Sequence, residues 1–149
     1  MDWTNFFNDL SDEEKDKIAI LRVMECTNGV IQHAHRDGAS YALPIEETRE
    51  AMQFSMGAIK RMTIPLRDKD ITFEPETEAV LRKIRDLYIS GVKNGHEENY
   101  QEFMRASEAS VQGVGWDRLV EAAKTIHQNF DNPIGVYSSY GLQYLSQFV

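Results

Sequence analysis

The chain has 149 residues, 42% of them hydrophobic and 27% charged, which is the size and composition of one globular domain. Its formal net charge of −8 disfavours direct binding to nucleic acid, because neutralising phosphates requires a basic surface. The lone cysteine excludes an internal disulfide and no apolar run reaches the ~18 residues of a membrane span, so we expect one soluble, cytoplasmic domain over residues 1–149 without a membrane partner.

The first predicted helix begins at a capping box, in which Ser11 is followed three residues later by Glu14. Apolar residues continue at helical spacing up to Cys26, and Asn28-Gly29 predicts the C-terminal end. Residues 30–43 are interpreted as a connection that contains at most a short helical turn.

A second helix is predicted from Ile45 to Met62, with glutamates at its start and Lys60 and Arg61 at its end. Pro65 ends it. The β-branched segment Asp70–Phe73 is interpreted as an extended link, because one short strand cannot form a sheet alone.

Three further helices are predicted from apolar stripes at i, i+3/i+4 spacing. They run from Pro75 to Asn94-Gly95, from Glu97 to Val111 and from Trp116 to Phe130. A last segment, residues 132–149, follows Asn132-Pro133. No stretch alternates apolar and polar residues, so we expect an all-α fold: an irregular bundle of five to six helices in a single domain.

Recognised catalytic and cofactor motifs are absent, and we expect no cofactor. The one cluster with ligand character is His33, His35 and Asp37. On an extended segment the two imidazoles would point the same way and could share a metal ion, whereas on a helix they would lie about 200° apart. The alternative is a solvated polar turn, which we favour.

Two other reactive side chains are interpreted as structural. Cys26 lies in an apolar helix, and free cysteine is commonly buried. His127 shares a helix side with Ala123 and Ile126, which predicts a buried or boundary histidine rather than a catalytic one.

The N-terminal region is acidic. The first sixteen residues hold six acids against Lys15 alone. The functional interpretation is a face that attracts a basic partner. Its candidate contacts are Asp9, Asp12, Glu13, Glu14 and Asp16, and the alternative is a solvated helix start.

Residues 132–149 carry no charged side chain. Drawn as a helix, they place four aromatic residues on one arc of roughly 80°: Tyr137, Tyr140, Tyr144 and Phe148. This aromatic stripe predicts either packing in the protein's own core or an interface with a partner or a second copy.

These observations lead to the hypothesis of a non-enzymatic, acidic helical protein that binds another macromolecule, as an antagonist (inhibitor), immunity-type protein or adaptor. One alternative is a small enzyme or ligand-binding protein with a site near His33, His35 and Asp37. Another is a structural or assembly subunit that uses residues 132–149.

Overall fold

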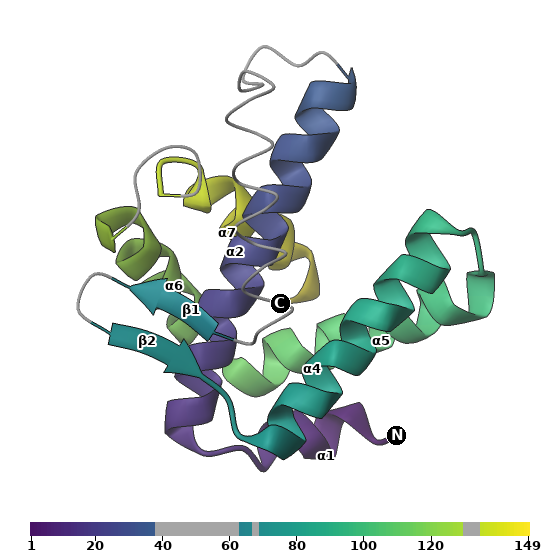
Figure 1. The fold of residues 1–149 in the computed structure, drawn as a ribbon, viewed down its shortest axis with the longest axis horizontal. Coiled ribbons are helices and arrows are strands. Elements are labelled where there is room, and N and C mark those ends of the chain that lie inside the picture. The colour runs from purple at the N-terminus through teal and green to yellow at the C-terminus, as the bar shows by residue number, and fades with distance from the viewer. Residues whose placement is uncertain (38–62, 67–68, 130–134) are drawn as a thin grey trace.

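The computed structural model describes residues 1–37, 63–66, 69–129 and 135–149. These residues form a helical bundle, which confirms the expected fold class (Figure 1). The helices are α1 (Trp3–Asn8), α2 (Asp12–Asp37), α4 (Pro75–Tyr88), α5 (Glu97–Val114), α6 (Trp116–Asn129) and α7 (Ser138–Leu145). A π-helical turn (η1, Ile89–Lys93) extends α4, a 3-10 turn (η2, Ser146–Phe148) extends α7, and two strands, β1 (Thr63–Leu66) and β2 (Lys69–Thr72), form a hairpin.

Helix α2 runs through the middle of the molecule and contacts α5, α6 and α7 (Figure 1). From Ile18 to Thr27 every side chain except Glu25 is buried. A helix that is buried on all sides must be apolar on all sides, and this segment is, apart from Arg22, Glu25 and Thr27. The core therefore forms around α2, with large contributions from Leu119 and Ile126 of α6.

We predicted that this helix ends at Asn28-Gly29. In the structure α2 continues to Asp37. A glycine inside a helix costs only about 1 kcal/mol. Thr27, directly before this pair, is fully buried and its Oγ1 donates to the carbonyl of Val23, 2.7 Å away. Packing at Thr27 holds the backbone helical up to the glycine, so the stop signal is overridden.

Helix α1 was not predicted. Asp2 caps it, since its carboxylate accepts from the backbone N–H of Asn5 at 3.0 Å. The indole Nε1 of Trp3 donates to Glu102 of α5 at 2.6 Å, and the Lys83 ammonium of α4 lies 5.7 Å from the Trp3 ring centre. One buried tryptophan thus ties α1 to two other helices.

The segment Asp70–Phe73 was predicted to be an extended link, but most of it belongs to a paired strand. Residues 69–72 pair antiparallel with residues 63–66, in a register that sets Ile64 opposite Ile71 and Pro65 opposite Asp70. The partner strand was not predicted because it contains Pro65. In a two-stranded ribbon both strands are edges, so a proline whose missing N–H would point outward is tolerated.

The predicted α4 and α5 segments are confirmed. Pro75 occupies the first turn of α4, and Gly95 ends the η1 turn with a positive φ of 75°. A Cβ on Gly91 would collide with the backbone of Tyr100, so the helical hairpin closes tightly at this glycine. The predicted helix Ile45–Met62 lies outside the described residues.

Candidate functional site

Helix α7 docks on α2 through Gly141, and on α6 through Ser138, whose Oγ donates to the carbonyl of Ala123 at 3.3 Å. Its buried residues are Ser138, Gly141 and Leu145, which recur every three or four positions. A Cβ on Gly141 would lie 2.6 Å from the carbonyl oxygen of Val23 and 2.7 Å from the backbone nitrogen of Thr27. The two backbones therefore approach as closely as a glycine allows.

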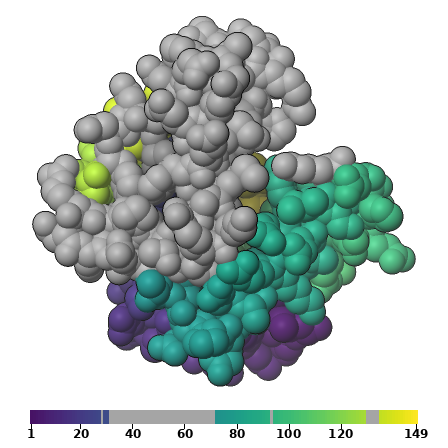
Figure 2. Space-filling model, viewed as in Figure 1, coloured from purple at the N-terminus to yellow at the C-terminus, as the bar shows by residue number. Residues whose placement is uncertain are grey.

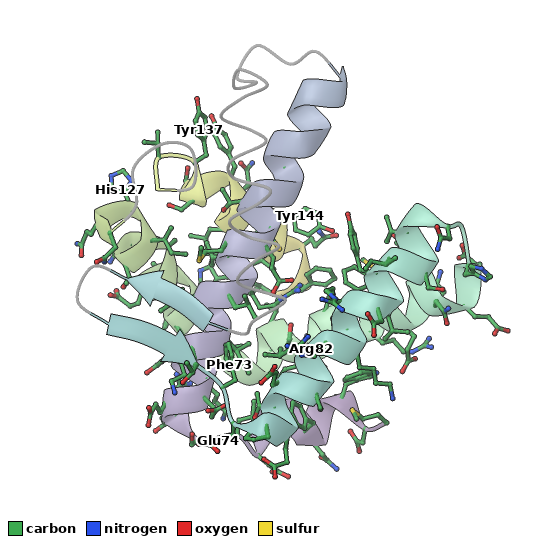
Figure 3. All side chains as sticks on the ribbon, in the orientation of Figure 1. Phe73, Glu74, Arg82, His127, Tyr137 and Tyr144 are labelled. Atoms are coloured by element: carbon green, nitrogen blue, oxygen red, sulfur yellow. The ribbon has the colours of Figure 1, made fainter. Side chains whose placement is uncertain are left out.

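This docking decides where the aromatic stripe lies. On a helical wheel the buried positions centre about 90° away from the stripe, so the rings flank the contact with α2 rather than fill it. Tyr137, Tyr140 and Phe148 are half-buried, and Tyr144 is 42% exposed. Figure 3 shows Tyr137 and Tyr144 at opposite ends of α7. The stripe is a boundary feature, and only Phe148 packs against the core cluster.

The rings also contact one another. Tyr137 and Tyr140 stack with centroids 5.4 Å apart and planes 21° apart. Tyr144 and Phe148 meet edge to face at 6.4 Å. In each pair the two rings therefore pack against each other within the chain.

The outer side of α7 continues this surface with uncharged side chains. We call this surface the α7 face; its residues are Val136, Ser139, Tyr140, Gln143, Tyr144 and Gln147. Val136 is 50% exposed, and the serine and both glutamines are exposed. The α7 face is thus a mixed aromatic and neutral polar surface.

Close to Tyr144 lies a group of ionisable side chains, of which sequence analysis singled out Cys26 but neither Arg22 nor Glu25. The Arg22 side chain is only 5% exposed and its Nη1 lies 3.6 Å from Oε2 of Glu25, whose side chain is 26% exposed. The Nε of Arg22 is buried, without a hydrogen-bond partner in the structure as described. An arginine inside the apolar run from Ile18 to Met24 was the available signal.

Burial governs the acid–base chemistry of this group. It raises the pKa of the Cys26 thiol to about 11, against the opposing effect of Arg22. Burial likewise raises the pKa of Glu25, although Arg22 lowers it. Burial, reinforced by Cys26, raises the pKa of Tyr144. Cys26 is buried in the core, as predicted, and a thiol with a raised pKa is a poor nucleophile.

The acidic N-terminal residues are largely engaged within the chain. Arg118 of α6 donates to Asp12 at 2.7 Å and to Asp16 at 3.0 Å. Glu13 pairs with Lys17 at 3.3 Å. Glu14 is buried, which leaves Asp9 as an exposed acid for which no ion pair is found among the described residues.

Other acids gather at the start of α5. Glu97, Glu98 and Glu102 line a surface hollow of about 510 Å³, together with Asn99, Gln101 and Arg105. The teal and green surface of α4 and α5 lies at the right of the molecule in Figure 2. The carboxylate of Glu102 is already bonded to Trp3 and Arg105, and these bonds lower its pKa.

The candidate metal ligands His33, His35 and Asp37 lie on the last turns of α2. A helix sets the first two positions about 200° apart, which is the geometry that disfavours a shared ion. Within the described residues no group of three metal-binding side chains is found. His127 is exposed rather than buried, and its Nδ1 lies 3.0 Å from the carbonyl of Gly135, so it joins α6 to the segment before α7.

Among the described residues, no helix is both long and apolar enough to cross a membrane. No protein-family model, curated protein or solved structure matches this chain.

Proposed function

We propose that this protein is a non-enzymatic binding protein, of the antagonist, immunity-type or adaptor kind, and that the α7 face is its contact surface for another protein. The observation that carries the proposal is the orientation of α7. Its small residues, Ser138 and Gly141, pack inward, while Tyr144 keeps 42% of its surface exposed.

The composition of the α7 face supports this role. Interface centres are enriched in tyrosine and depleted in charge, and tyrosine gives large contact area at low cost in side-chain entropy. A structural or assembly subunit would use the same surface in the same way.

A basic partner remains a second candidate, through the acidic surface rather than α7. The hollow beside Glu97 and Glu98 suits a cationic side chain, and Asp9 adds an exposed acid on the N-terminal side. Asp12 and Asp16 are less suited to this contact, because Arg118 already neutralises them.

The proposal is tested by affinity capture from the native source with the parent protein and Tyr144→Ala as baits. The matched control is Ile89→Ala, because Ile89 is a similarly exposed hydrophobic residue, at 40%, and belongs to the η1 turn rather than to the α7 face. We expect at least one protein to be retained by the parent and the control but lost with Tyr144→Ala. Identical captured sets with all three baits, at unchanged helicity, would refute a contact at α7.

A further inference from the structure

We infer that the α7 face is the interface of a reversible homodimer, so that its occupant is the α7 face of a second copy. This assignment rests on the proposed function and specifies the partner. In a two-fold dimer the same surface meets itself, so each group lies opposite its own copy or a near neighbour of that copy.

Self-contact restricts which polar groups are acceptable. Carboxylates facing carboxylates repel, and ammonium groups facing ammonium groups do the same. Hydroxyl and carboxamide groups both donate and accept hydrogen bonds, so they can pair with their own copies. Ser139, Gln143 and Gln147, the exposed polar residues of the α7 face, are all of this kind.

Because the whole chain is negatively charged, an uncharged α7 face favours contact between two copies. Each copy carries a formal charge of −8, so two copies repel at an average surface. The exposed sides of the other long helices in the described part of the chain bear charged residues, such as Lys83 on α4, Glu108 on α5 and Glu121 on α6. Residues 132–149 carry none, so α7 is the surface where a second copy meets the least opposition.

The same surface also supplies apolar contact. Tyr144 is 42% exposed and Val136, at the other end of α7, is 50% exposed. The stacked rings of Tyr137 and Tyr140 are already ordered, so little side-chain entropy is lost when they are covered. Because Gly141 seats α7 directly on the α2 backbone, the rings project from a rigid support.

The size of the surface sets the strength of the dimer. Helix α7 has 8 residues and η2 has 3, a length of roughly 17 Å at about 1.5 Å per residue. A surface of this length buries less area than the ~800 Å² per partner of a standard stable interface. The dimer is therefore expected to form and dissociate with concentration rather than to be permanent.

Sedimentation equilibrium over a wide concentration range tests the inference. The mass of the parent protein should rise from 17.1 kDa toward twice that value as concentration increases. Gln143→Glu places a like charge on both copies of an exposed site and should hold the mass at one chain. The isosteric control Asn94→Asp, at an exposed position after η1, should dimerise like the parent.

A charge-pair experiment separates self-association from other contacts. Gln143→Lys alone should also be monomeric, whereas an equimolar mixture of Gln143→Lys and Gln143→Glu should recover the dimer. A parent that stays at one chain mass throughout, or a dimer unaffected by Gln143→Glu, would overturn the inference. If the parent is monomeric but Tyr144→Ala still loses a captured protein, only the second copy fails as the partner and the proposed function stands.

Discussion

Replacing Gly141 by alanine tests the docking of α7 on α2. In an ordinary helix this change stabilises by about 1 kcal/mol, because alanine loses less backbone entropy on folding. Here the new Cβ would lie 2.6 Å from the carbonyl oxygen of Val23 and 2.7 Å from the backbone nitrogen of Thr27. Backbone atoms in the middle of α2 cannot move aside as a flexible side chain can, so α7 must shift.

Overpacking of a tight contact costs typically about 1–3 kcal/mol, which exceeds the propensity gain. We expect Gly141→Ala to lower the free energy of unfolding by about 1–2 kcal/mol and the melting temperature by roughly 3–6 °C for a chain of this size. Gly29→Ala is the matched control, since a Cβ there meets no atom within 4 Å in the structure as described. It should stabilise the protein by about 0.5–1 kcal/mol.

Thermal and urea unfolding followed by circular dichroism at 222 nm would measure both variants. The opposite signs of the two effects are the diagnostic result. If Gly141→Ala stabilised the protein as Gly29→Ala does, α7 would not approach α2 through Gly141, and the placement of the aromatic stripe would be wrong.

Three further predictions concern other parts of the structure. Glu25→Leu should destabilise by several kcal/mol, because it leaves the buried Arg22 charge uncompensated. Arg22→Met should cost far less, because burial raises the pKa of Glu25 and its carboxyl can take up a proton once Arg22 is gone. Chemical denaturation of both variants measures the asymmetry. Stability should fall as the pH rises from about 9, the ordinary thiol value, to about 11, because the folded protein disfavours the Cys26 thiolate, and Cys26→Ala should reduce this alkaline loss in pH-dependent denaturation. Coupling between Arg118 and Asp12 in a double-mutant cycle should be about 0.2–1 kcal/mol and should shrink in high salt, because Asp12 is exposed; a coupling above 2 kcal/mol would contradict this account.

The three helical segments from Pro75 to Asn129 were predictable because each has an apolar stripe at helical spacing between turn or capping signals. Gly29 shows the limit of such signals, since α2 continues through it to Asp37. The hairpin was missed because a proline, Pro65, lies in the partner strand, so residues 63–66 were not expected to form a strand.

The aromatic residues of the candidate site could be predicted from the sequence, but the way α7 packs could not. Spacing placed Tyr137, Tyr140 and Tyr144 on one arc, but it could not show which side of α7 meets α2. The packing side is made by Ser138 and Gly141, whose small size matters more than their hydropathy. Pairing of acids with Arg118 depends on contacts across more than a hundred residues, and no local pattern encodes them.

Hydroxyl-radical footprinting of Tyr144 at low and high protein concentration tests the central claim most directly. The ring should be readily oxidised in dilute solution, where it is 42% exposed, and protected in concentrated solution, where the α7 face is covered. Leu145, which is fully buried, should stay unmodified in both, and Ile89 should be modified equally in both. Protection of Tyr144 at both concentrations would place it in the core, and equal oxidation at both would show that no second copy covers α7.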